Sequence, residues 1–250
     1  MAQLFGHEKL QVYQKGIAFA EMRKGLLQGL PRRVSACEHL ERATESILVN
    51  IAHASSLWSS KERIVYLGQA NGSALECAAC LDVFLAKELM SVEAASPGKS
   101  LLAEIVSILV SMWKTTADRV REDHAPYRTK LGKLFSHEDL DVYQASLLLA
   151  AWVERMVVEF SCSADLLAKL DKSTTSVPLN IAEGTGRFTG TDKAKFYEIA
   201  YKATVQSAAL VDLATLSTSA DLSRVDDGKK LLRRIAAMLT SLSKASVRKD

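Results

Sequence analysis

The chain consists of one sequence unit that occurs twice. Residues 1–120 align with residues 131–250 at a constant offset of 130 and without gaps. The segment from Phe5 to Gln14 recurs as Phe135 to Gln144, and identities are spread over the whole unit. A duplication explains this pattern, so we expect two copies of one small domain. Function then has to be considered for each copy and for the pair.

Composition favours helices in both copies. Each unit of about 115 residues is large enough for its own hydrophobic core. The 250 residues include four prolines and twelve glycines, and 48% of the residues are hydrophobic while only 6% are aromatic. Alanine and leucine are abundant, which suits long helices and leaves little room for many β-turns. We therefore predict an all-α fold.

Apolar residues recur at spacings of three and four, which predicts four helices in each repeat. The expected inward stripe of the first helix, about residues 8–29, is Leu10, Tyr13, Ile17, Ala20 and Leu27, with Leu140, Tyr143, Leu147, Ala150 and Val157 as its copy. The stripe of the fourth helix is Leu101, Leu102, Ile105, Ile108, Leu109 and Met112, matched by Leu231, Leu232, Ile235, Met238, Leu239 and Leu242.

Local signals predict where the other helices begin and end. The segments 35–38 and 59–62 both have a capping-box pattern, so the second and third helices should start there. In repeat 2 the third helix should start after Thr191. The second helix of that repeat should stop at Gly184 with a left-handed cap. The fourth helices should start near Pro97 and near Asp226.

Short connections make neighbouring helices antiparallel. The predicted architecture is two tandem antiparallel up-down-up-down four-helix bundles. Repeat 1 spans residues 1–118, a charged linker spans 119–134, and repeat 2 spans 135–250.

The sequence offers no pattern for catalysis, a cofactor or a metal. Cys77 and Cys80 have CxxC spacing, but they lie in an apolar helical stretch without a second pair, so we interpret them as buried free thiols. No Glu-x-x-His pair, catalytic triad or phosphate loop is found. The start of the chain lacks a signal pattern, and the longest apolar run, 101–113, is too short to span a bilayer. We expect a cytoplasmic protein that is not an enzyme and has no membrane or small-molecule partner.

The segment from Ser176 to Arg187, SVPLNIAEGTGR, carries a family resemblance. It resembles the signature of the four-helix-bundle proteins encoded in 23S rRNA intervening sequences. That family also contains the accessory variability determinant of diversity-generating retroelements. The resemblance implies a non-enzymatic bundle that assembles through bundle-to-bundle contacts, often into five-membered barrels. For the retroelement members it implies a basic assembly that engages RNA and a reverse transcriptase.

Each repeat keeps a different half of the family pattern. Repeat 1 keeps Gly72, Ser73 and Glu76, which become lysine, alanine and glutamine in repeat 2. The other signature is complete only in repeat 2; the residues concerned are Asn180, Glu183, Gly184 and Arg187, of which repeat 1 retains Asn50. We hypothesise that the two retained halves contact each other. Because a chain with two bundles cannot tile a ring of five, stacked rings, an even ring, a dimer and a monomer all stay open.

A basic cluster is the second candidate site. Lys229, Lys230, Arg233 and Arg234 lie on about one and a half turns of the last helix, where they could follow a phosphate backbone or form a solvated face. Net charge is only +3, which permits nucleic-acid contact without requiring it. We predict a non-catalytic scaffold that self-associates or packs its repeats together and binds RNA or a protein such as a reverse transcriptase. The alternative is a pure protein-interaction module.

Overall fold

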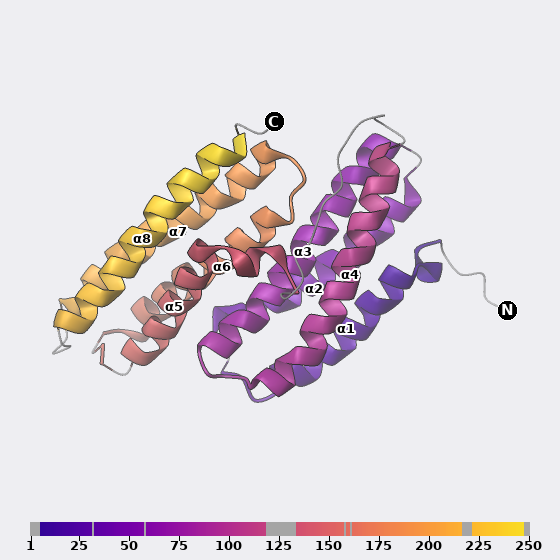
Figure 1. Cartoon of the computed structure of the whole chain (residues 1–250). Helices are drawn as coiled ribbons and strands as arrows, with labels where there is room; N and C mark the ends of the chain where they lie inside the picture. Colours follow the sequence, from indigo (N-terminus) through magenta and orange to yellow (C-terminus); the bar gives the residue numbers. More distant parts are fainter. Residues whose placement is uncertain are drawn as a thin grey trace.

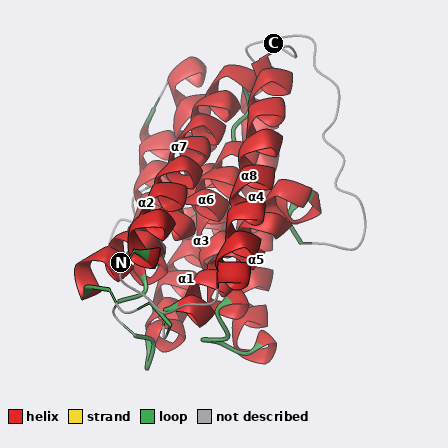
Figure 2. Ribbon diagram, turned by 90° about the vertical axis from the view of Figure 1, so that its left-hand side faces the viewer, coloured by secondary structure: helices red, strands yellow, loops and turns green. Residues whose placement is uncertain are grey.

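The computed structural model of the chain describes residues 6–31, 33–57, 59–118, 134–157, 159–160, 162–216 and 222–247. Every regular element in these residues is helical (Figure 2). Repeat 1 contains α1 (Gln11–Leu27), α2 (Ser35–Ser56), α3 (Ser60–Ala86) and α4 (Val92–Asp118). Repeat 2 contains α5 (Asp141–Met156), α6 (Ala164–Thr185), α7 (Gly190–Thr215) and α8 (Leu222–Val247). Short 3-10 helices, His7–Lys9 and Ser136–Asp139, precede α1 and α5.

The two repeats form two four-helix bundles, as predicted (Figure 1). In repeat 1, helices adjacent in sequence pack together, and α1 also packs on α4. Repeat 2 repeats this arrangement, with α5 packed on α8. The predicted linker, 119–134, lies outside the described residues except for Leu134, so the proposed domain limits stay predictions.

Several helix ends follow the predicted signals. The hydroxyl of Ser59 accepts the amide N–H of Glu62 and caps α3. Thr189 caps α7 in the same way, two residues before the predicted start. The fourth helices begin earlier than predicted, at Val92 and Leu222. The reason at α4 is a cap from Ser91, whose hydroxyl accepts the N–H of Ala94 and places Pro97 inside the helix.

The predicted capping box at the start of α2 is wrong. Val34 occupies the cap position and gives no side-chain hydrogen bond, while the hydroxyl of Ser35 is buried without a partner. The amide of Ser35 donates instead to the carboxylate of Asp171 in repeat 2, at 2.8 Å. A helix end in repeat 1 is therefore satisfied by the other repeat.

The inward face was predicted correctly for the fourth helix but only in part for the first, where Tyr143 and Ala150 of the stripe predicted for α5 are fully buried. Leu102, Ile105 and Leu109 of α4 are fully buried, and their copies in α8 are buried too. In α1 the buried residues are Val12, Gly16 and Phe19, whereas Ile17 from the predicted stripe is 40% exposed. The true inward face is rotated from the predicted stripe by about one residue, or roughly 100°.

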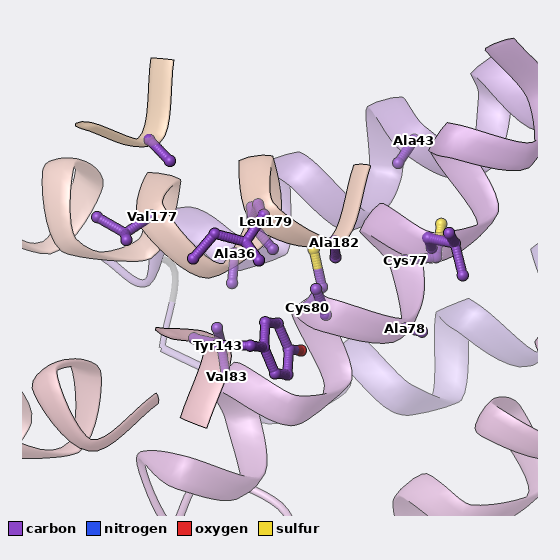
Figure 3. Close-up of a cluster of buried hydrophobic side chains, with 14 of the residues drawn as sticks. Ala36, Ala43, Cys77, Ala78, Cys80, Val83, Tyr143, Val177, Leu179 and Ala182 are labelled. Carbon is purple, nitrogen blue, oxygen red and sulfur yellow. The ribbon is translucent and has the colours of Figure 1, made fainter. Parts of the chain in front are cut away.

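One hydrophobic core runs through both bundles. The buried cluster includes residues of α2, α3, α5 and α6, and Figure 3 shows Leu179 and Ala182 of α6 close to Ala36 and Cys80 of repeat 1. The bundles meet mainly through α3 and α6, which lie side by side in Figure 1. The two repeats are thus packed against each other within one chain.

Within the described residues, α4 is the one helix long and apolar enough to cross a membrane by length and composition. It exceeds the apolar run 101–113 because it begins at Val92. A core helix of a bundle meets the same criteria, and one face of α4 lies in the core. This helix is therefore weak evidence for a membrane span.

Candidate functional site

The contact between α3 and α6 brings together glycines from both repeats. A β-carbon at Gly72 of α3 would lie 3.1 Å from Cγ of Glu183 and 3.2 Å from Cζ of Arg187. At Gly186, which follows α6, a β-carbon would lie 2.7 Å from Cδ1 of Leu75 and 3.1 Å from the Cα of Gly72. A β-carbon at Gly186 would force Leu75 to shift, and one at Gly72 would require Glu183 and Arg187 to give by a few tenths of an ångström. The two glycines therefore set how closely α3 and α6 approach.

Polar and aromatic groups fix the register of this contact. The side-chain amide of Asn71 donates to the carbonyl of Gly186 at 2.9 Å. The rings of Trp113 and Phe188 stack with their centroids 4.0 Å apart, which adds an aromatic pair across the repeats. Both contacts involve residues that the sequence analysis did not single out.

Charged groups are buried beside the glycines. Arg187 donates to the carboxylate of Glu183, and its guanidinium lies 4.4 Å above the ring of Phe196. Burial raises the pKa of Glu183 from 4.5 to about 7, and the nearby carboxylate of Glu76 adds to the effect while Arg187 opposes it. Glu76 is held 3.0 Å from Nδ1 of His39 in its own repeat. The contact thus contains a carboxyl group that titrates near neutral pH.

The structure places the predicted motif residues in two groups. Gly72 touches Glu183 and Arg187, and the electrostatic influence of Glu76 reaches Glu183. Ser73, Asn50 and Asn180 instead form hydrogen bonds within their own repeats. The hydroxyl of Ser73 pairs with that of Ser46 at 2.8 Å. The remaining pair, Asn180 and Asn50, each donate to the carbonyl and hydroxyl of the serine four residues earlier, at 2.8 and 3.0 Å.

The left-handed cap predicted at Gly184 is wrong. Gly184 lies inside α6, and Gly186 follows the helix with a φ of −75°. A β-carbon at Gly184 would lie 2.7 Å from Cε1 of Tyr197 on α7. Glycine is needed there because α6 and α7 approach closely, so its role is packing within repeat 2.

A second polar cluster joins the repeats near the start of α5. The ammonium of Lys99 lies 2.6 Å from Asp82 in repeat 1 and 2.5 Å from Glu138 in repeat 2. The hydroxyl of Tyr143 donates to the other oxygen of Asp82 at 2.7 Å. His137 is fully buried next to Tyr143, and burial lowers its pKa to about 3. Helix periodicity and motifs did not indicate this cluster, although aspartate, lysine, glutamate and tyrosine recur at the matching positions of both repeats.

A third cluster ties the end of α3 to repeat 2. The buried ammonium of Lys87 lies 2.5 Å from Asp171 and 3.5 Å from Glu154. Glu154 also pairs with Arg33 at 2.5 Å. Buried charges of this kind need partners, and here each partner comes from the other repeat.

The two repeats contribute different surfaces to their contact. We call one the α3 face; it comprises Asn71, Gly72, Leu75 and Asp82 of α3 with Lys99 of α4. We call the other the α6 face; it comprises Leu179, Glu183, Gly186 and Arg187 with Glu138 and Tyr143 at the start of α5. A contact between unlike surfaces is heterologous, so among the described residues the copies of both faces lie outside it.

The basic cluster on α8 is largely paired with aspartates. Lys229 lies 2.5 Å from Asp212 of α7. Lys230 lies 3.0 Å from Asp226 and 3.2 Å from Asp227, and Arg233 lies 3.8 Å from Asp226. The fourth cation, Arg234, is exposed. Because three aspartates lie beside these four cations, most of the positive charge is neutralised. The remaining positive potential is weak for binding a phosphate backbone.

The two thiols with CxxC spacing lie in the core rather than in a reactive site. Cys77 and Cys80 are free and fully buried, and burial raises the pKa of both. A thiol with a raised pKa is a poor nucleophile and metal ligand. In the part of the chain that the structure describes, no three His, Cys, Asp or Glu side chains are grouped as metal ligands would be.

These features define a tandem pair of four-helix bundles joined by a heterologous, glycine-lined contact. The chain belongs to the family of 23S rRNA-intervening sequence proteins, whose family model matches residues 8–111 and again residues 138–241. The two matches are offset by 130 residues, like the sequence repeat. Comparison with curated proteins and with solved structures gave no match.

Proposed function

We propose that this protein is a non-catalytic scaffold that acts through protein–protein contacts made by its helix faces. The observation that supports this most is the α3–α6 contact. Its residues with unusual chemistry, the largely buried Glu183 and Arg187, lie against Gly72 of the other bundle, and Gly186 packs against Leu75 and Gly72. The proposal includes no small-molecule substrate, cofactor or membrane partner and assigns the protein to the cytoplasm.

RNA binding through α8 is the second candidate. It is supported by the exposed Arg234 and by the excess of basic residues in the second half of the chain. The aspartates beside Lys229, Lys230 and Arg233 argue against it. Affinity for RNA that falls steeply between about 50 and 200 mM salt, and that is lost in a Lys230/Arg233/Arg234→Ala variant, would support this candidate. An accessory role with a reverse transcriptase belongs to this second candidate.

Site-specific photo-crosslinking in the native cell tests the proposal. A photoreactive residue at Val205, on the exposed side of α7, should give protein adducts. The same residue at Val65, an equally exposed position on α3, is the control and should give none. A photoreactive residue at Arg234 should give no RNA adducts. RNA adducts from position 234 without protein adducts from position 205 would contradict the proposal.

A further inference from the structure

Repeat 1 has a surface pocket at the end of its bundle where α1 stops and α4 begins. The pocket has a volume of about 490 Å³, which lies within the range of sites for small molecules. The lining is mostly apolar with two polar side chains, as is typical of ligand sites. The lining residues on which the argument rests are Met22, Gln28, Leu30, Met90, Ser91 and Ala94.

The duplication shows what fills the corresponding place in repeat 2. Trp152 corresponds to Met22, and only 7% of it is exposed. Its ring makes an edge-to-face contact with Phe160, with the centroids 6.2 Å apart. Its ring N–H donates to the carbonyl of Arg224 at 3.1 Å. An indole ring therefore links the end of α5 to the start of α8.

The counterparts of these three residues line the pocket in repeat 1. Each of them is smaller than the residue it matches; the pairs are Met22 and Trp152, Leu30 and Phe160, and Ala94 and Arg224. Groups that contact one another in repeat 2 thus surround a hollow in repeat 1.

The ion pair beside the indole ring is also missing in repeat 1. In repeat 2, Glu159 pairs with Arg224, the residue that accepts the N–H of Trp152. The corresponding residues are Gly29 and Ala94, which have no charged side chain, so no such pair closes the pocket. Sequence motifs did not indicate this site, because it results from separate differences in side-chain size between the repeats.

The walls of the pocket suit an aromatic ring. Met22 and Met90 both line it, and thioether sulfurs make favourable contacts with aromatic rings. Ala94 also lines it, at the position whose carbonyl accepts the indole N–H in repeat 2. We therefore expect the same acceptor for a ring N–H in repeat 1.

We propose that this pocket binds a small molecule of the indole class, with its ring between Met22 and Leu30 and its N–H donated to the carbonyl of Ala94. The ligand takes the place that the side chain of Trp152 holds in repeat 2. The pocket is larger than an indole ring, which leaves room for a substituent. The ligand is bound and not converted, so the inference goes beyond the scaffold function and does not depend on it.

Titration of the full chain with 5-fluoroindole, followed by fluorine NMR, tests the site. Binding should saturate at one molecule per chain with a dissociation constant below about 1 mM. Met22→Trp fills the pocket from α1 with the residue found in repeat 2, and Ala94→Trp fills it from an exposed position on α4. Each should weaken binding by about tenfold or more, because an indole side chain then occupies the place of the ligand.

Two controls accompany these variants. Val65→Trp adds the same side chain at an exposed position of α3 outside the pocket and should bind 5-fluoroindole like wild type. Circular dichroism shows whether each variant is folded. If Met22→Trp does not fold, Ala94→Trp still decides the question, because its position lies on the surface of a helix.

Competitors test the chemistry of the ligand. The analogue 1-methylindole has no ring N–H and should compete about threefold more weakly than indole, because it loses the hydrogen bond. N-acetyl-L-tryptophanamide carries the same ring on peptide amides, which would lose water against the apolar walls, so it too should compete less well than indole. Better competition by this amide would assign the pocket to a tryptophan side chain of a protein and overturn the small-molecule inference.

Other results would overturn the inference as well. They are the absence of saturable binding to wild type, unchanged binding in a folded pocket variant, loss of binding in Val65→Trp, and equal competition by 1-methylindole and indole. None of these results bears on the scaffold function, which the crosslinks from position 205 test separately.

Discussion

Replacing Glu183 with glutamine should make the protein more stable at alkaline pH. Burial beside Glu76 raises the pKa of Glu183 from 4.5 to about 7, and the side chain is only 17% exposed. The folded chain therefore binds this proton more tightly than the unfolded chain, and wild-type stability should rise as pH falls from about 8 to about 5. Glutamine resembles the protonated carboxyl group and can still accept a hydrogen bond from Arg187.

The size of this effect follows from the pKa difference. A difference of about 2.5 units is worth roughly 3 kcal/mol, so Glu183→Gln should gain about that free energy of unfolding near pH 8. Near pH 5 the gain should fall below about 1 kcal/mol, because wild-type Glu183 is then protonated in the folded chain.

Urea denaturation followed by circular dichroism, at both pH values, measures these gains. Glu198→Gln, at an exposed glutamate on α7, is the control and should stay within about 0.5 kcal/mol of wild type. A Glu183→Gln variant that is less stable than wild type near pH 8, or equally stabilised at both pH values, would show that folding does not raise the pKa of Glu183.

Other substitutions probe the contact between repeats. Gly186→Ala should cost about 1–3 kcal/mol of stability by overpacking α3 against α6, and the matched Ser56→Ala should be nearly neutral; chemical denaturation compares them. Lys99→Met should cost about 3–5 kcal/mol because it removes the cation that two largely buried carboxylates share, whereas its counterpart Lys229→Met should cost under about 1 kcal/mol. If Lys99→Met and Lys229→Met lost the same stability in thermal denaturation, repeat 2 would not be burying the Asp82–Lys99 ion pair. Cys80 should resist alkylation in the native protein, since burial raises its pKa; mass spectrometry that finds it labelled as fast as in urea would contradict this.

The bundles could be predicted because their signal is local. Spacings of three and four place Leu102, Ile105 and Leu109 on one helix face, and that face is buried in both repeats. The first helix was harder because it has apolar residues on two faces. Phe19 packs in its own bundle, while Ile17 lies on the side that repeat 1 presents outward. Periodicity alone cannot show which of two apolar faces is buried in the core.

The site was predicted only in part. The complementary loss of motif residues pointed to Gly72, Glu183 and Arg187, and the structure places these three in contact. Ser73 and Asn180 bond within their own repeats, which motif matching could not distinguish. The cluster around Lys99 was missed because its three charges and Tyr143 lie on four separate elements and become neighbours only when the repeats pack.

The central claim is that the two repeats fold as one unit with a shared core. Differential scanning calorimetry on the full chain tests it most directly, by comparing the calorimetric enthalpy of unfolding with the van't Hoff enthalpy. A shared core predicts one transition with a ratio close to one and a total unfolding enthalpy near 0.7 kcal/mol per residue. Two transitions, or a ratio near two, would contradict it by showing that the bundles unfold independently.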